Sequence, residues 1–119
     1  FVGIESRGFI LASIFAQRYN KGMILLRKAG KLPGKNVKTS YTIEYVKVVL
    51  EIQKTALNEG ESVVICDDLL ATGGTANAAA KLVEKMKGKI TGFAFIIELT
   101  ELCGVKKISK YKAVSLVQY

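Results

Sequence analysis

Short apolar runs alternate with segments of helical spacing along the chain, and this alternation predicts the order of the secondary structure. Apolar runs and strand-like alternation predict strands near residues 1–4, 22–27, 46–54, 62–67, 91–99 and 113–118. Helices are predicted over residues 8–19 and 75–87, with a long loop between 27 and 46. Alternating strands and helices predict an α/β fold: a mostly parallel, twisted, doubly wound sheet flanked by helices.

Residue spacing also predicts a core-facing helix and supports one of the strands. In the first predicted helix, the residues with helical spacing that we expect to face the sheet are Ile10, Leu11, Ile14, Phe15 and Tyr19. In the strand over 46–54, the positions that alternate are Val48, Leu50 and Ile52 against Val49, Glu51 and Gln53. The helical set is interpreted as core, and the alternating set is interpreted as a strand.

One predicted strand ends in two adjacent acids and a loop of small residues. Val63–Cys66 precedes Asp67 and Asp68, and Ala71–Thr75 leads into the second predicted helix. Small side chains let backbone N–H groups approach a ligand where a helix begins, which is typical of a phosphate site. Carboxylates at the carboxyl end of a strand suit sugar hydroxyls or a hard cation. An ordinary strand-to-helix turn is the alternative, but it gives no reason to place two like charges together.

The composition favours one soluble domain over residues 1–119. Half of the residues are apolar, which is enough for one core. No run approaches the roughly 20 apolar residues that span a bilayer, and there is no signal-peptide pattern. Cys66 and Cys103 provide neither a disulfide framework nor a metal-binding pair, so we expect free thiols and a cytoplasmic location. Without histidine, proton transfer must use a carboxylate, tyrosine, lysine or water.

The formal net charge of +8 comes largely from two groups of basic residues. The first falls in and after the second predicted helix and is interpreted as a solvated face: Lys81, Lys85, Lys87 and Lys89. The second is an acid-free run among Gly and Pro residues: Arg27, Lys28, Lys31, Lys35 and Lys38. This run indicates a mobile basic flap that closes on a charged ligand, with a plain surface loop as the alternative.

These segments together resemble the type I phosphoribosyltransferases. Val63–Thr75 resembles the family's phosphoribosyl diphosphate motif. Four other segments occur in the order and approximate spacing of the family's adenine-specific branch: Glu5–Phe9, Arg27–Gly34, Ser40–Tyr45 and Leu50–Lys54. The resemblance runs from Phe1 to Tyr119 and implies a type I phosphoribosyltransferase-like fold with a flexible flap.

The resemblance also implies a set of ligand-binding residues. Asp67 and Asp68 are expected to bind the ribose hydroxyls of phosphoribosyl diphosphate, directly or through Mg²⁺. The 5-phosphate is expected to be wrapped by Ala71, Thr72, Gly73, Gly74 and Thr75. Pyrophosphate is expected to meet Glu5, Ser6, Arg7, Arg27, Lys28 and Lys31, with a cis peptide between Glu5 and Ser6. Without the resemblance, Glu5–Arg7 is more typical of a helix cap with a surface arginine.

The implied activity is purine salvage by a homodimer, with no nucleic-acid or membrane partner. Adenine and phosphoribosyl diphosphate would give AMP and pyrophosphate with Mg²⁺. Glu44 is the implied general acid/base, with Tyr45 closing beside it; otherwise Glu44 would be an exposed strand residue. The family commonly has Gly where this chain has Val46, so we expect altered flap closure because Val avoids positive φ.

Two other functions stay open at this point. One is a non-catalytic regulator that senses phosphoribosyl diphosphate and binds nucleic acid through its positive charge. The other is a transferase for hypoxanthine or guanine. The chain does not begin with Met, and Phe1–Ile4 resembles an interior strand of the family. We therefore expect that the N-terminal segment that forms a hood over the purine is missing.

Overall fold

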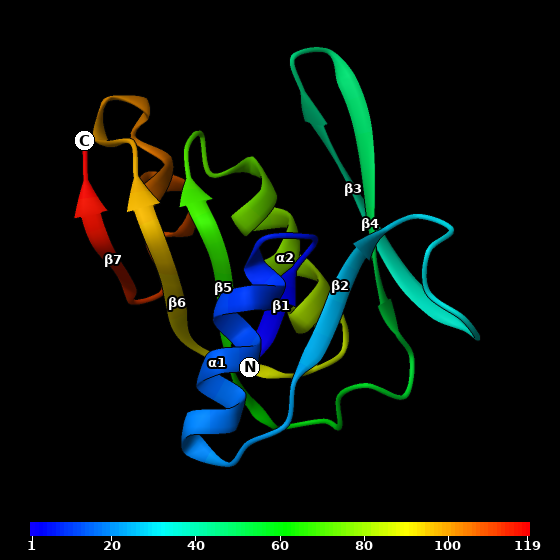
Figure 1. The fold of residues 1–119 in the computed structure, drawn as a ribbon. Coiled ribbons are helices and arrows are strands. Elements are labelled where there is room, and N and C mark those ends of the chain that lie inside the picture. Colours follow the sequence, from blue (N-terminus) through cyan, green and yellow to red (C-terminus); the bar gives the residue numbers. More distant parts are fainter.

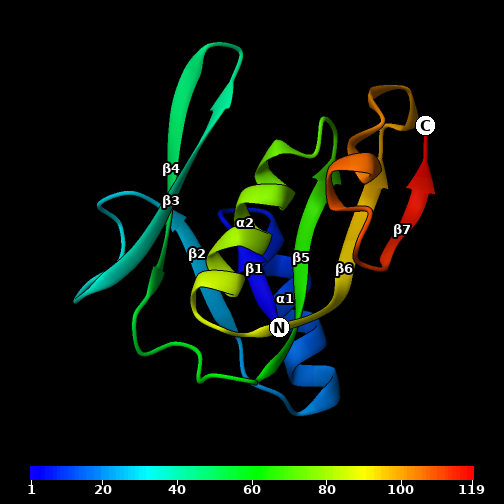
Figure 2. The same cartoon turned by 180° about the vertical axis from the view of Figure 1, so that it is seen from behind.

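The chain forms a seven-stranded sheet with one α-helix on each face (Figure 1, Figure 2). The computed structural model describes residues 1–119. The strands are β1 (Val2–Ile4), β2 (Ile24–Lys28), β3 (Asn36–Ile43), β4 (Val46–Gln53), β5 (Ser62–Leu70), β6 (Lys89–Glu98) and β7 (Ala113–Gln118). The helices are α1 (Gly8–Tyr19), α2 (Gly74–Lys85) and the short 3₁₀ helices η1 (Thr100–Leu102) and η2 (Gly104–Ile108).

The sheet is parallel except at one edge. Its strand order is β3-β4-β2-β1-β5-β6-β7, and β2, β1, β5, β6 and β7 run parallel. β4 is antiparallel to β2, and β3 is antiparallel to β4. The carboxyl ends of the parallel strands share one edge, so the segments that follow β1, β2 and β5 meet there. The predicted α/β class and mostly parallel sheet are confirmed.

The larger core lies between the sheet and α2. It contains 18 buried residues, and α2 contributes mainly alanines to it. Small side chains let the helix axis lie close to the strands, which fixes the start of α2 beside the end of β5. The strand predicted from the alternation over 48–53 is confirmed as β4, and its Leu50 and Ile52 are both buried in this core.

The predicted buried face of α1 is wrong for three of its five residues. Leu11 is buried and Phe15 is half-buried, but Ile10, Ile14 and Tyr19 are 62%, 57% and 61% exposed. The helix meets the sheet mainly through its small residues Gly8, Ala12 and Ala16, which are buried and lie four residues apart. A Cβ on Gly3 of β1 would lie 3.0 Å from the Ala12 Cβ, so bulky residues do not fit on this face. Apolar periodicity alone does not detect a contact face made of small residues.

The loop predicted after β2 contains a strand. Residues 36–43 form β3, which pairs with β4 along its whole length from Asn36 with Gln53 to Ile43 with Val46. The resulting hairpin rises beyond the rest of the sheet (Figure 1). Only one face of β3 is covered, and its exposed face carries Lys and Thr. The sequence therefore lacks the apolar run that would predict this strand.

The predicted free cysteines and the predicted solvated lysine face are confirmed. Cys66 is buried and Cys103 is exposed, and both are free thiols. Lys81, Lys85, Lys87 and Lys89 are all exposed. None of the helices has the length and apolar character that crossing a membrane requires.

Candidate active site

A cavity of about 700 Å³ opens at the carboxyl edge of the sheet. Its walls come from the segments after β1, β2 and β5 and from the β3–β4 hairpin. It brings together the following predicted site residues: Glu5, Ser6, Arg7, Lys28, Lys31, Glu44, Asp67, Asp68, Ala71, Thr72, Gly73, Gly74 and Thr75. Arg27 and Tyr45 are the predicted site residues that do not line it.

The loop between β5 and α2 has the features of an anion cradle. Gly73 has a φ of 84°, in the left-handed region where Gly carries no steric penalty, and α2 starts at the next residue. No side chain caps the start of α2. The N–H donors of its first turn are therefore available to a ligand, and the helix dipole favours an anion there.

Two acids lie within the last part of β5, beside this loop. The predicted strand ended at Asp67, but β5 continues to Leu70, so both carboxyls project from a strand that the sheet holds in place. The Asp68 N–H donates to Asp67 Oδ1 at 2.9 Å. Burial raises the pKa of Asp67 to about 7, and the neighbouring Asp68 carboxylate acts in the same direction.

Arg7 forms an ion pair with the second acid. Its Nε donates to Asp68 Oδ2 at 2.5 Å. Partial burial alone would raise the pKa of Asp68, but the hydrogen bond from Arg7 outweighs it and holds that pKa below its usual range. The Arg7 side chain is 71% exposed, so its guanidinium remains open to solvent and to an incoming anion.

Close backbone contact places Arg7 at this position. A Cβ on Gly8, the first residue of α1, would lie 2.6 Å from the Cys66 carbonyl oxygen and 3.2 Å from Asp67 Oδ1. Only glycine allows the start of α1 to lie directly on β5, and this contact brings the segment before α1 to the acid pair. The peptide bond between Glu5 and Ser6 is cis, which confirms that expectation.

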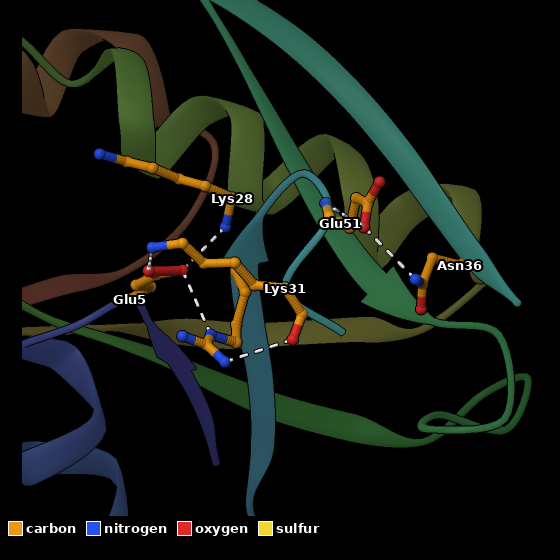
Figure 3. Close-up of polar contacts among 7 residues, drawn as sticks. Glu5, Lys28, Lys31, Asn36 and Glu51 are labelled. Atoms are coloured by element: carbon orange, nitrogen blue, oxygen red, sulfur yellow. Dashed lines mark hydrogen bonds and ion pairs between the residues drawn. The ribbon is translucent and has the colours of Figure 1, made fainter. Parts of the chain in front are cut away.

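The Glu5 carboxylate is paired with neighbouring basic residues and is not a free carboxylate in the cavity (Figure 3). It accepts hydrogen bonds from Lys31 Nζ at 2.5 Å, the Lys28 backbone N–H at 2.9 Å and Arg27 Nε at 3.3 Å. Burial alone would raise the pKa of Glu5, but these donors, Lys31 foremost, lower it. The Lys28 ammonium extends away from this cluster (Figure 3) and lines the cavity.

Glu51 of β4 holds the rest of the basic segment. Its Oε2 accepts from the Gly30 N–H at 3.4 Å and from Asn36 Nδ2 at 3.3 Å (Figure 3). The same Asn36 group also donates to the Leu32 carbonyl at 3.1 Å. The segment between β2 and β3 is thus tied to the sheet at both ends.

The hairpin tip presents Glu44 to the cavity. Glu44 and Tyr45 are the central residues of a two-residue turn, with φ of 46° and 68°. Val46 pairs with Ile43 and has no positive φ, so its β-branched side chain does not meet the conflict expected for it. Tyr45 is fully exposed in this arrangement, and its closing beside Glu44 stays a prediction.

Tyr41 is a site residue that sequence reasoning missed. Its hydroxyl lies 3.1 Å from Thr75 Oγ1, so β3 contacts the first turn of α2. Tyr41 and Ile43 lie on the same face of β3, because they are two residues apart in a strand. This spacing could have predicted that both line the cavity, but only with residues 36–43 recognised as a strand. Ile43, an apolar residue that lines the cavity, was missed for the same reason.

The raised pKa of Asp67 predicts a pH-dependent effect of Asp67→Asn. The Asp67 carboxyl has its ordinary pKa of 3.8 in the unfolded chain and a pKa of about 7 in the folded chain. Its contribution to stability is therefore full at low pH and is lost as pH rises toward 7. We expect the free energy of unfolding of Asp67→Asn, relative to that of the parent, to rise by at least about 1 kcal/mol from pH 5 to pH 8. Urea unfolding in metal-free buffer measures this, and a pH-independent difference would contradict it.

Comparison with known proteins shows which family this chain resembles. Residues 1–118 match the phosphoribosyl transferase domain. The adenine phosphoribosyltransferase of Nitrosopumilus maritimus is 71% identical over 119 residues, which cover 100% of this chain and 70% of that protein. The corresponding protein of Cenarchaeum symbiosum is 60% identical over 117 residues, covering 98% of this chain and 69% of that one.

Solved structures show the same fold. The adenine phosphoribosyltransferase of Thermoanaerobacter pseudethanolicus superposes with a TM-score of 0.96 at 45% identity, covering 99% of this chain and 69% of that one. The Saccharomyces cerevisiae protein, complexed with an imino-altritol bisphosphate and adenine, has a TM-score of 0.93 at 42% identity, covering 97% and 65%. The cradle, the acid pair and the basic cluster thus lie in a fold shared with these enzymes, and the chain belongs to the phosphoribosyltransferase family.

Proposed function

We propose that this chain transfers the phosphoribosyl group of phosphoribosyl diphosphate to a ring nitrogen of adenine, giving AMP and pyrophosphate. The observation that carries the proposal is that an anion cradle, an acid pair, two lysines and Glu44 all line one cavity. The structure of the Saccharomyces cerevisiae relative holds adenine, and that of the Trypanosoma brucei relative, at 32% identity, holds AMP, pyrophosphate and ribose-5-phosphate. Both sets of ligands fit this reaction.

The cradle and the acids hold the sugar. The 5-phosphate binds the N–H groups at the start of α2, with the Thr72 and Thr75 hydroxyls as further donors. Asp67 and Asp68 accept hydrogen bonds from the ribose hydroxyls. Fixing the sugar at two points orients its anomeric carbon toward the hairpin side of the cavity.

In this proposal, the pyrophosphate replaces Asp68 as the partner of Arg7. Arg7 is bound to Asp68 in this structure, and its exposed guanidinium matches a phosphate with two parallel donors. When Arg7 moves to the pyrophosphate, Asp68 becomes available to the ribose. Lys28 and Lys31 supply further positive charge, while Glu5 orients Lys31 and the peptide of Lys28.

The acid pair also fits Mg²⁺. Asp67 and Asp68 are adjacent carboxylates on the cavity wall, and no group of three or more His, Cys, Asp or Glu residues is arranged to hold a metal. This set suits Mg²⁺, which commonly uses one or two carboxylates with substrate phosphates and keeps several waters. When bound, the ion would neutralise charge that develops on the leaving pyrophosphate.

Glu44 serves the base. As the bond from the adenine nitrogen to the anomeric carbon forms, the bond from that carbon to pyrophosphate breaks, and the nitrogen's proton passes to the Glu44 carboxylate. The transition state has oxocarbenium character, so charge stabilisation by the chain's cations dominates. No covalent enzyme intermediate takes part.

The proposed reaction is tested by the release of pyrophosphate from phosphoribosyl diphosphate and Mg²⁺ with single bases. We expect turnover with adenine and none above background with hypoxanthine, guanine or orotate. Turnover with hypoxanthine or guanine would replace adenine as the substrate. Binding of phosphoribosyl diphosphate without turnover on any base would contradict catalysis and favour a sensor.

Glu44→Gln tests the acid/base role. The amide keeps the shape of the side chain but cannot accept the proton, so we expect turnover to fall by roughly 10²–10⁴-fold with the fold intact. Glu59→Gln is the matched control, because Glu59 is exposed and outside the cavity, and it should leave turnover unchanged. Near-parental turnover in Glu44→Gln would remove Glu44 from the mechanism.

A further inference from the structure

The segment between β6 and β7 lies at the same end of the sheet as the phosphate loop (Figure 2). It contains η1 and η2, which are joined at Cys103 and Gly104. η2 packs against α2, and Leu102 of η1 lines the cavity. Nothing in the sequence pattern assigns this segment to the site.

The backbone at the η1–η2 junction is in direct contact with the phosphate loop. A Cβ on Gly104 would lie 2.8 Å from the Gly73 nitrogen and 3.0 Å from the Ala71 carbonyl carbon, and closer still to the Ala71 oxygen. The contact is reciprocal, because a Cβ on Gly73 would lie 3.0 Å from the Gly104 carbonyl carbon. Both glycines are buried. Two main chains therefore meet here with no side chain between them.

The junction is anchored on both sides. Cys103 ends η1 in the left-handed region, with φ of 53°, and its N–H donates to the Thr100 carbonyl at 3.1 Å. The Thr100 N–H and hydroxyl both donate to the Tyr119 carbonyl, at 2.8 and 2.7 Å. At the other end, Ile108 is 1% exposed in the main core. An η1–η2 junction anchored in this way can resist displacement of the phosphate loop that packs against it.

We propose that Gly104 is a positioning residue for the 5-phosphate, acting through the loop at Ala71–Gly73. Because its backbone lies against that loop, the loop cannot retreat from the ligand, and its N–H donors stay aimed at the phosphate. Any side chain at residue 104 would push the loop into the cavity or the junction away from it. The inference rests on the proposed function, because it assigns the loop to the 5-phosphate.

Gly104→Ala tests the proposal through ribose 5-phosphate binding, measured by titration calorimetry without catalysis. A displaced cradle should raise the Kd for ribose 5-phosphate by at least about tenfold. The KM for phosphoribosyl diphosphate should rise in parallel, with kcat and the KM for adenine changed much less. If the parent binds no ribose 5-phosphate, the proposed function itself fails, whereas equal binding by parent and variant overturns only the role of Gly104.

Two other glycines provide matched controls. Gly22→Ala adds a Cβ into open space and should change neither stability nor affinity. Gly88→Ala crowds the Leu57 and Val83 side chains, at 2.5 and 2.9 Å, away from the phosphate loop. It should lower the Tm while the Kd for ribose 5-phosphate stays within about twofold of the parent. If Gly88→Ala lost as much affinity for ribose 5-phosphate as Gly104→Ala, lost stability alone would explain both results, and the proposal would be overturned.

Hydrogen exchange on the parent chain gives the same test if Gly104→Ala does not fold. Ribose 5-phosphate should slow amide exchange at residues 103–107 as well as at 72–76, because the loop transmits its ordering to the η1–η2 junction behind it. Protection confined to residues 72–76 would overturn the proposal.

Discussion

The ion pair between Arg7 and Asp68 is the interaction on which the site depends. Two adjacent carboxylates on the wall of a cavity repel each other, and burial adds to the cost of ionising them. Arg7 offsets that cost for Asp68. Because Arg7 is largely exposed, the pair is weak enough to be exchanged for a ligand.

The same logic extends through the basic cluster. Glu5 holds Lys31, Arg27 and the Lys28 peptide in one place, so positive charges that would repel one another are kept together. A ligand that brings both a pyrophosphate and ribose hydroxyls satisfies the cations and the acids at once. A simple anion satisfies only the cations. With the proposed roles, the arrangement would favour a phosphorylated sugar over other anions of similar charge.

Much of this site follows from the sequence, because its chemistry is concentrated in short segments. Asp67, Asp68 and Ala71–Thr75 all lie within residues 67–75, and a strand followed by a helix allows only one edge of the sheet for them. The α1 face and β3 were misjudged because their contacts are long-range. Whether Ala12 or Ile14 faces the sheet depends on how closely β1 approaches, and β3 is recognisable only through its pairing with β4. The approach of Gly104 to Gly73 joins segments about thirty residues apart and has no local signal.

The central claim is that Arg7 changes partner from Asp68 to the pyrophosphate. Titration calorimetry of Arg7→Ala with two ligands tests it most directly: phosphoribosyl diphosphate with Mg²⁺, and ribose 5-phosphate, which lacks the pyrophosphate. The account predicts that affinity for phosphoribosyl diphosphate falls by at least about tenfold, while affinity for ribose 5-phosphate stays within about twofold of the parent. An equal loss for both ligands, or no loss for phosphoribosyl diphosphate, would contradict it.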